Sequence, residues 1–423
     1  MHPIESLISV THPDLTTQSF WELKLKMDEV KSKKLIASSY STNDDGSSDY
    51  FDLPEAPGPY WNVLGASSQF LYFTMLTIGS QGTSPPINYI LLIDTSSDLT
   101  WIQCLPCEEC FSQLAPIFDP LQSPKFSVKS CKHYKFCNGH DGGCNERGEC
   151  TYIAQYYDGS YSLGIIAEDT CRFDEREMSF NIGCGSKNRG NLFNGSDGVL
   201  GLGRGRLSFP SHLAFEFGFK KFSYCLIADK SGPTRSASAL RFGNYVFDEP
   251  NDAVFTPLIY KPESPSIYYI NITAIYVGGD SMSEVYKSVS YGMRVDSGTM
   301  LTYLPTHIYE FLRDSFRDAA LSLGYKSVEA IYSDTCYDMG GYPGGIANAP
   351  QVTLYFDGDD EGKLELNPHN VLYNYPWVNE NLYCLAFNIS ADGHAVLGNV
   401  QQQGVRVMYD PEGLVIGFDP NSC

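Results

Sequence analysis

The sequence predicts an all-β protein in which two similar β lobes surround a central cleft, with few short helices. From residue 68 onward, runs rich in Tyr, Phe, Ile, Val and Thr, such as "QFLYFTMLTIG" and "IYYINITAIYVGG", alternate with Gly, Pro, Asn and Asp. Turns at intervals of about ten residues are typical of mostly β proteins. Helical patterns are confined to 209–218 and 307–324 in this part of the chain. A long-period repeat is the third observation, and it predicts the lobes.

The repeat pairs two short motifs in the same order in each half of the chain. "LLIDTSS" at 91–97 resembles "MRVDSGT" at 293–299, and "GVLGLG" at 198–203 resembles "AVLGNV" at 395–400. Gly201 follows Asp94 by 107 residues, and Gly398 follows Asp296 by 102 residues. Two ordered pairs with matched spacing are not expected by chance. Each lobe therefore offers one Asp on a loop beside an apolar-apolar-Gly strand.

The bulk composition excludes several classes of protein. The 423 residues suffice for two or three domains, and 43% of them are apolar, which allows a large core. The formal net charge of −21 argues against a nucleic-acid partner, because phosphates would repel this surface. No apolar run reaches the length of about 18 residues that a membrane span needs, so we expect none.

Cysteine usage indicates an oxidising compartment. Seven of the thirteen cysteines lie between positions 104 and 150. The spacing Cys104-x-x-Cys107-x-x-Cys110 is compatible with thiolate ligands of a metal, but we favour disulfides. The reason is that the segment is rich in Pro, Gly and Asn and has no His at a supporting spacing. Three glycosylation sequons agree with secretion, at Asn194, Asn271 and Asn388.

The N-terminal segment has a different character. "MHPIESLISVTHPDL" lacks a basic start followed by an apolar core, so no signal peptide is visible. We therefore expect the true start of the protein to lie upstream of Met1. Residues 16–35 are predicted to form a Lys-rich helix, which a polar linker at 38–50 follows.

The two repeated aspartates define a chemistry. Alone, an Asp after an apolar run is most often a turn-former or a cap. Two of them in contact across a lobe junction share one proton, because both carboxylates do not ionise together. One then acts as base on a water, and the protonated one hydrogen-bonds a substrate carbonyl. Asp94 and Asp296 would thus hydrolyse amides at acid pH without a metal or cofactor.

Roughly residues 65–423 resemble the pepsin-like aspartic proteases, most closely the plant nepenthesin-type branch. The resemblance rests on "IDTSSDLTWIQC", "YYDGS", "FGN", "VDSGTMLTYLP", "VLGNVQQQ" and the cysteine-rich segment after Trp101. It implies a bilobal all-β fold with a cleft and makes Asp94 and Asp296 the catalytic pair. The active-site loops that it implies contain Thr95, Ser96, Ser297, Gly298 and Thr299.

The resemblance also assigns residues around the pair. Tyr156 in "QYYDGS" occupies the place of the Tyr on the flap, the hairpin that closes over the substrate. Trp101 matches the Trp that supports this Tyr; without the resemblance both would be interpreted as core or surface aromatics. Twelve cysteines fit the nepenthesin-type pattern, which implies six disulfides. Cys171 is left over, and the sequence leaves the pairing itself open.

The family makes zymogens in which a basic prosegment covers the cleft at neutral pH. Residues 1–58 are expected to be such a prosegment and its linker. The N-terminal lobe with its cysteine-rich insertion is then 59–254, and the C-terminal lobe is 255–423. The first 40 residues hold five Lys and five acidic residues, so the net charge of −21 lies in the rest. Acid would protonate carboxylates in the rest of the chain and so release the prosegment. We expect the cleavage that removes it to fall within 38–58.

Two positions depart from the family pattern. Ser96 replaces the Gly after Asp-Thr, and Tyr157 replaces the Gly after the flap Tyr. A left-handed backbone at Ser96 would cost about 1–2 kcal/mol. Otherwise Ser supplies the same N–H as Gly, and its hydroxyl can add a hydrogen bond. Tyr157 adds bulk at the flap tip and would narrow substrate choice or slow the flap. We expect lower activity or a shifted pH optimum rather than loss.

The sequence thus predicts a secreted or vacuolar plant aspartic endopeptidase, with the apoplast as one destination. We expect a monomer that acts on polypeptides and prefers apolar residues around the cleaved bond. The alternative is a weak or inactive binding protein of the same fold that inhibits cell-wall-degrading enzymes. The presence of both Asp94 and Asp296 with their hydroxyl neighbours favours the protease.

Overall fold

The structure is a computed structural model that describes most of the chain after the first 59 residues. It describes residues 60–423 except 63, 67–70, 81–85, 133–136, 138–141, 174–175, 194, 228–238, 248–251, 284, 286–291, 331–332, 359–361, 376–377 and 421. The expected prosegment and its helix at 16–35 lie outside the described residues. The sequon residue Asn194 does so as well.

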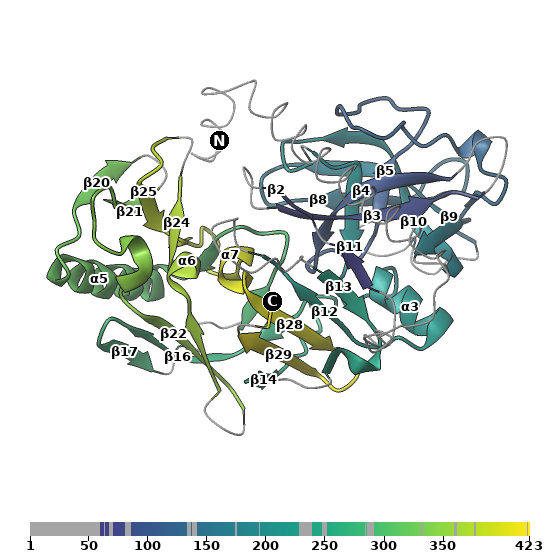
Figure 1. Ribbon diagram of the computed structural model, residues 1–423. Coiled ribbons are helices and arrows are strands. Elements are labelled where there is room, and N and C mark those ends of the chain that lie inside the picture. Colours follow the sequence, from purple (N-terminus) through teal and green to yellow (C-terminus); the bar gives the residue numbers. More distant parts are fainter. Residues whose placement is uncertain are drawn as a thin grey trace, which may run out of the picture.

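The all-β prediction is confirmed, and Figure 1 shows two β-rich halves on either side of the molecule. The N-terminal half is built on a ten-stranded sheet in the order β2-β3-β4-β11-β5-β10-β9-β8-β7, with β6 paired to β9. Its strands are β2 (Leu64–Ala66), β3 (Leu71–Ile78), β4 (Ile87–Asp94), β5 (Trp101–Gln103), β6 (Ser127–Val128), β7 (Gly142–Cys144), β8 (Cys150–Gln155), β9 (Tyr161–Phe173), β10 (Arg176–Arg189) and β11 (Gly198–Gly201).

A six-stranded sheet connects the two halves, in the order β1-β13-β12-β28-β29-β14. Its strands are β1 (Tyr60–Asn62), β12 (Phe222–Cys225), β13 (Ala239–Phe242), β14 (Val254–Pro257), β28 (Val405–Asp410) and β29 (Val415–Pro420). The last two strands of the chain therefore pair with strands from its middle. A disulfide between Cys225 and Cys423 fastens the C-terminus to this sheet.

Three smaller sheets form the C-terminal half. One has the order β15-β18-β27-β19-β26, another β17-β16-β22-β23, and the third β20-β21-β25-β24. Their strands are β15 (Tyr269–Ile270), β16 (Ile272–Val277), β17 (Asp280–Ser283), β18 (Met293–Val295), β19 (Thr302–Leu304), β20 (Ser327–Ala330), β21 (Ser333–Asp338), β22 (Val352–Phe356), β23 (Lys363–Leu366), β24 (Leu372–Asn374), β25 (Leu382–Leu385), β26 (Phe387–Ile389) and β27 (Ala395–Leu397).

The helices are few and short, as predicted. The two helical segments read from the sequence become α3 (Phe209–Phe217) and α5 (Thr306–Ser322). Helix α3 begins at its N-cap Ser208 and ends at Gly218, whose φ of 71° places it in the left-handed region. The remaining described helical elements are α6 (Pro368–Val371), α7 (Asn399–Gln402) and the 3₁₀ turns η1 (Pro120–Gln122), η3 (Asn244–Phe247) and η4 (Gly345–Asn348).

The sequence repeat corresponds to the same strand pairing in each half. Strand β11 runs parallel to β4 with Gly201 opposite Asp94, and β27 runs parallel to β18. A Cβ on Gly201 would come within 2.2 Å of the Asp98 carbonyl oxygen, and one on Gly398 within 2.3 Å of the Leu301 carbonyl oxygen. Both repeats thus need Gly, because the loop after each Asp runs directly against that strand.

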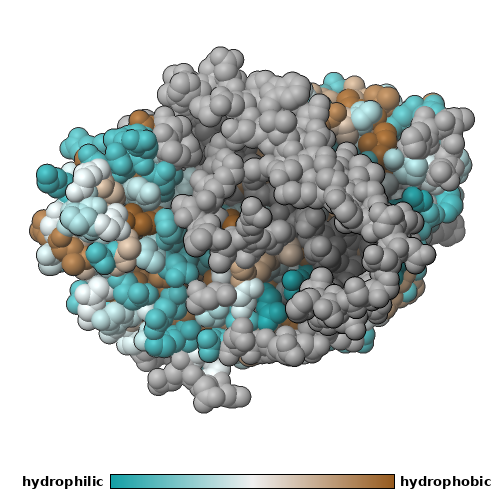
Figure 2. All heavy atoms as spheres, in the orientation of Figure 1, coloured by the Kyte–Doolittle hydropathy of each residue, from teal (hydrophilic) through white to brown (hydrophobic). Residues whose placement is uncertain are grey.

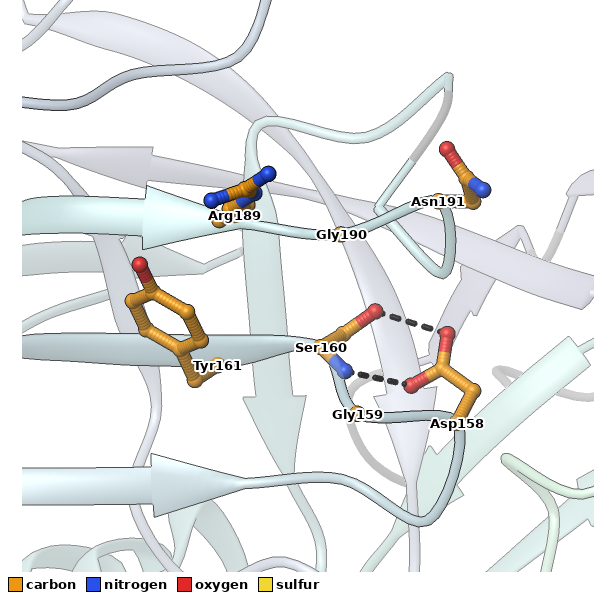
Figure 3. Close-up of a pocket in the computed structure, with 7 residues that line it drawn as sticks. All are labelled: Asp158, Gly159, Ser160, Tyr161, Arg189, Gly190 and Asn191. Atoms are coloured by element: carbon orange, nitrogen blue, oxygen red, sulfur yellow. Dashed lines mark hydrogen bonds between the residues drawn. The ribbon is translucent and has the colours of Figure 1, made fainter. Parts of the chain in front are cut away.

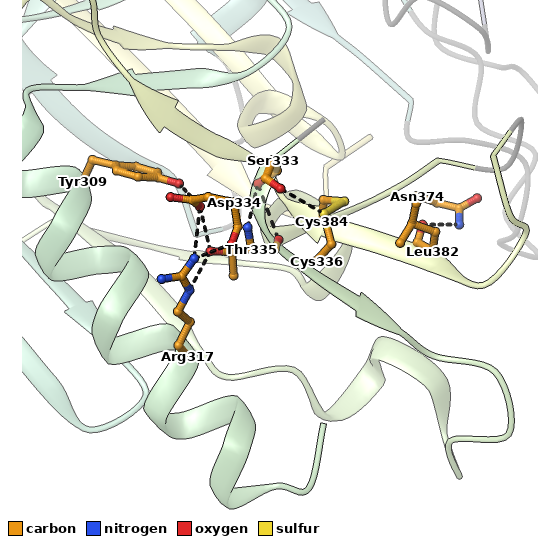
Figure 4. Close-up of a disulfide and its surroundings, with 9 residues drawn as sticks. All are labelled: Tyr309, Arg317, Ser333, Asp334, Thr335, Cys336, Asn374, Leu382 and Cys384. Carbon is orange, nitrogen blue, oxygen red and sulfur yellow. Dashed lines mark hydrogen bonds and ion pairs between the residues drawn. A yellow bond between two sulfur atoms is a disulfide. The ribbon is translucent and has the colours of Figure 1, made fainter. Parts of the chain in front are cut away.

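The disulfide prediction is confirmed, and the metal interpretation of the cysteine cluster is wrong. Twelve cysteines form six bonds: 104–184, 107–110, 131–144, 137–150, 225–423 and 336–384. Cys171 is a buried free thiol. Figure 4 shows the pair Cys336–Cys384 between β21 and β25, beside the contact that Arg317 of α5 makes with the Thr335 hydroxyl.

The described surface is mostly polar. In the view of Figure 2, hydrophilic side chains cover much of the coloured surface of the C-terminal half, interrupted by smaller apolar patches. Among the described helices, none combines the length and apolar character that a membrane crossing requires. The core lies inside the sheets, where a large cluster of buried side chains extends through both halves.

Candidate active site

The two repeated aspartates meet where the halves of the chain join. Asp94 is the last residue of β4, and Asp296 directly follows β18. Their exposed fractions are only 5% and 3%. A Cβ on Gly298 would lie 3.0 Å from the Asp94 Oδ1 and 3.4 Å from the Asp296 Oδ1. Both carboxyls therefore flank the same glycine, and a side chain at this position would press against both of them.

A reciprocal set of hydrogen bonds joins the loops that carry the pair. The Thr95 N–H donates to Ser297 Oγ at 3.1 Å, and the Ser297 N–H donates to Thr95 Oγ1 at 3.0 Å. Each hydroxyl also donates across the junction, Thr95 Oγ1 to the Val295 carbonyl and Ser297 Oγ to the Ile93 carbonyl. Because Thr95 and Ser297 are fully buried, these four bonds fix the relative position of the two aspartates.

Each carboxyl is held by donors from its own loop. Asp94 accepts from the Ser96 N–H at 2.8 Å and from the Ser97 hydroxyl. Asp296 accepts from the Gly298 and Thr299 N–H groups at 2.9 and 3.1 Å, and from Thr299 Oγ1 at 2.9 Å. Both loops thus hold their carboxyl with a backbone N–H and a hydroxyl, and the Asp296 loop adds a second N–H.

The electrostatics of the pair favour a proton on Asp94. Burial and the neighbouring charge of Asp296 raise the pKa of Asp94 to about 6, against the hydrogen bonds from Ser97 and Ser96. Asp94 therefore keeps its proton at a higher pH than an ordinary carboxyl does. A pair of carboxyls that holds one proton is able to polarise a carbonyl and deprotonate a water at the same time.

Ser96 does not strain the loop. The only described non-glycine residue with a positive φ is Leu414, so the left-handed alternative does not apply to Ser96. Its N–H supplies the hydrogen bond to Asp94 that a Gly would supply. Its hydroxyl does not add the hydrogen bond that it could make, since Ser96 Oγ is buried without a partner among the described residues. The substitution therefore leaves the backbone geometry intact and adds one unsatisfied polar atom.

The predicted aromatic pair is in place above the aspartates. Trp101 Nε1 donates to the Tyr156 hydroxyl at 2.7 Å, and the Phe193 ring packs edge-on against both. Burial, followed by the charge of Asp94, raises the pKa of Tyr156, so its hydroxyl remains protonated. Trp101 is itself fully buried. The tyrosine is therefore held from behind by a rigid core side chain.

Tyr156 opens a tight turn between β8 and β9. Its N–H donates to the Ser160 carbonyl, and Asp158 accepts from both the N–H and the hydroxyl of Ser160. Figure 3 shows the two bonds between Ser160 and Asp158 beside a cavity of about 320 Å³, which residues 158–161 line together with residues 189–191. Tyr157 stands at the tip of the turn with 65% of its surface exposed. The expected flap is thus a hydrogen-bonded hairpin with a bulky tip.

A second cavity, of about 510 Å³, lies on the Asp296 side of the pair. The flap tip reaches it, since Tyr157 is one of its lining residues. Arg294 on β18 also lines it, and its Nη2 forms an ion pair with Asp296 Oδ2 at 3.2 Å. Arg294 is not one of the site residues predicted from the sequence. The signal was available, because the repeat places Leu92 at the same position two residues before Asp94.

The sequons have different surroundings. Asn271 Nδ2 donates to Asp357 Oδ2 at 3.4 Å, and Asn388 lies half-buried in β26, at the edge of its sheet. Glycosylation at these positions stays a prediction. In the described part of the chain, no three His, Cys, Asp or Glu side chains gather as a metal site requires.

Comparisons with known proteins show the family of the chain. The family models "Xylanase inhibitor N-terminal" and "Xylanase inhibitor C-terminal" match residues 72–244 and 267–420. The chain is 34% identical over 403 residues to "Protein ASPARTIC PROTEASE IN GUARD CELL 2" of Arabidopsis thaliana, covering 93% of this chain and 79% of that protein. It is 33% identical to "Aspartic proteinase nepenthesin-2" of Nepenthes gracilis, covering 83% and 78%.

The fold also matches a solved structure of a seed protein. Basic 7S globulin from soybean aligns with a TM-score of 0.67 and 19% identity, covering 85% of this chain and 96% of the globulin. Fold and paired aspartates together define a chain of the pepsin-like aspartic protease class. Within this class, the chain belongs to the plant family that includes the nepenthesins.

Proposed function

We propose that this protein is an aspartic endopeptidase that hydrolyses peptide bonds at acid pH. The observation that carries the proposal is the pair Asp94 and Asp296, which flank Gly298 and are joined by the Thr95–Ser297 hydrogen bonds. A water between the carboxyls loses its proton to the ionised one and attacks the peptide carbonyl. The protonated carboxyl hydrogen-bonds the carbonyl oxygen, and a proton then passes to the leaving nitrogen.

The flap supports this proposal by providing a second wall for the substrate. Tyr156 faces the aspartates with its hydroxyl held by Trp101, so closure of the hairpin would exclude water from the reacting bond. The cavity beside Asp296 contains Arg294, Glu263, Asp392 and His394. We infer that the expected preference for apolar residues does not extend to the substrate side chain that enters this cavity.

An inhibitory binding protein is the second candidate. It is favoured by the names of the matching family models, which refer to xylanase inhibitors, and by the similarity in fold to a seed globulin. Against it, both aspartates and all of their hydrogen-bonding neighbours are present. The orphaned hydroxyl of Ser96 is the one feature of the pair that fits reduced activity.

The compartment and processing are part of the same proposal. Six disulfides support secretion to the apoplast or delivery to the vacuole, because such bonds persist in oxidising compartments. We infer that the enzyme is made as a zymogen and acts as a monomer on polypeptides. Tryptic mapping of protein isolated from its tissue would locate the mature N-terminus and any glycans.

Turnover of a denatured protein at pH 3–5, with and without pepstatin, tests the catalytic proposal. The Asp296→Asn variant is the blank, because it keeps the shape of the side chain and removes its charge. We expect pepstatin-sensitive cleavage by the wild type alone. Equal cleavage by wild type and blank would reject the protease hypothesis and favour the inhibitory binding protein. Assays of xylanase inhibition would then test that second candidate.

A further inference from the structure

The cation beside the aspartate pair distinguishes one loop from the other. Both loops hold their Asp with a backbone N–H and a hydroxyl, but the position two residues before the Asp is Leu92 in one loop and Arg294 in the other. Leu92 is fully buried in the N-terminal core, whereas the Arg294 side chain is 30% exposed. Each carboxyl is therefore held by N–H and hydroxyl donors of its own loop, but only Asp296 has a cation beside it among the described contacts.

The backbone holds Arg294 where it reaches Asp296. It is the middle residue of β18, opposite Tyr269 on β15 and Val396 on β27. Both neighbours in β18 are buried, so the strand alternation turns the Arg294 side chain away from the core and into the cavity. Its Nη2 lies 3.2 Å from Asp296 Oδ2, the oxygen that also accepts from Thr299 Oγ1.

We propose that Arg294 is a positioning residue that keeps Asp296 ionised and thereby leaves the shared proton on Asp94. The inference rests on the proposed function, because it assigns the base to Asp296 and the acid to Asp94. A fixed positive charge favours every ionised form of the pair, so both proton losses occur at lower pH than they would without it. Arg294 thus sets the pH range in which the pair holds one proton.

Other titratable groups face the pair, but they do not replace this cation. Burial raises the pKa of Tyr156 on the flap, Tyr224 on β12 and Tyr409 on β28, so these three stay neutral in acid. Around Arg294 itself, the cavity also presents Tyr157, Glu263, Tyr269, Tyr303, Asp392 and His394. The charge of Arg294 also stabilises the ionised form of Asp94, and it therefore lowers the pKa that burial and Asp296 raise.

The test compares Arg294→Leu, Arg294→Lys and Arg172→Leu with the wild-type chain. Leu is the residue of the matching position in the other half, and Lys keeps the charge without the fork of the guanidinium. Arg172, which pairs with Glu177 on the surface, is the control for loss of one positive charge. Asp carboxyls labelled with ¹³C are titrated by NMR, and the signals of the pair are assigned with Asp94→Asn and Asp296→Asn.

We expect Arg294→Leu to move both titration steps of the pair upward by about one pH unit. An opposite charge at this distance is worth roughly 1–3 units, and partial exposure places the effect at the lower end. Arg294→Lys and Arg172→Leu should stay close to wild type. Unchanged steps in Arg294→Leu, or an equal shift in Arg172→Leu, would overturn the inference.

The pH dependence of kcat/KM separates this inference from the proposed function. In an active enzyme, both limbs of the profile should move upward together in Arg294→Leu and return in Arg294→Lys. If the wild-type chain shows no turnover but its carboxyl titration shifts as expected, the proposed function fails and the inference about Arg294 stands. If turnover is normal and the titration does not shift, the reverse holds.

Discussion

Replacing Thr95 by Val would test whether the hydrogen bonds between the two loops position the aspartates. Val has nearly the same shape but lacks Oγ1, so the buried Ser297 N–H loses its acceptor and the Val295 carbonyl loses its donor. Leaving a buried polar group unsatisfied costs about 1–3 kcal/mol, so the two together cost roughly 2–6 kcal/mol. An unfolding entropy of about 2.1 cal/mol/K per residue gives roughly 1 °C per kcal/mol for 423 residues, so Tm should fall by roughly 2–7 °C.

Activity should fall along with stability, because the variant loosens the pair that must share a proton. A displacement of about 1 Å at reacting groups can cost roughly 100-fold in rate. We therefore expect kcat to fall by about 100-fold with little change in KM. Thr95→Ser is the matched control, since it keeps the hydroxyl and loses only a methyl group. Calorimetry and peptide hydrolysis at pH 4 measure both effects. Equal Tm and kcat for the Val and Ser variants would refute the reasoning.

Three further predictions concern the pair, the flap and the shared sheet. Since the pKa of Asp94 rises from 3.8 to about 6 on folding, the native state binds more protons in this window, and the free energy of unfolding should decrease as the pH rises from 4 to 6. Denaturation curves of Asp94→Asn should lack this part of the pH dependence. The same pH dependence in wild type and Asp94→Asn would disprove the prediction. Tyr157→Gly should widen the range of peptides cleaved in a library digest, because the exposed ring borders the cavity beside Asp296. An unchanged cleavage pattern would show that Tyr157 does not restrict the choice of substrate. The Cys225→Ser, Cys423→Ser double variant should lose about 2–5 kcal/mol of stability, measured in urea, because this bond closes a loop of 198 residues; a midpoint equal to wild type would contradict it.

The sequence predicted those features that leave a local pattern. The repeat predicted an apolar-apolar-Gly strand beside the loop of each Asp, and β11 and β27 occupy these places; that they run parallel to β4 and β18 came from the structure. Helices α3 and α5 were visible from their apolar spacing. The catalytic candidates followed from the repeat, since two acids in matched positions imply a shared site.

Features that depend on side-chain direction were predictable only in part. The repeat distinguishes Arg294 from Leu92, but the contact of Arg294 with Asp296 requires a particular rotamer as well as the alternation of β18. The orphaned hydroxyl of Ser96 likewise depends on packing across the junction. The cavity beside Asp296 collects residues from the flap, from around Tyr269 and from around Asp392, which lie far apart in the chain.

The most direct measurement of the central claim is a double-mutant comparison of kcat/KM at pH 4 for wild type, Asp94→Asn, Asp296→Asn and the combined variant. If the two carboxyls act as one acid–base unit, each single variant loses at least about 10²–10⁴-fold, and the combined variant loses little more. Two independent losses that multiply, or a single variant that cleaves like the wild type, would show that the aspartates do not share one proton in catalysis.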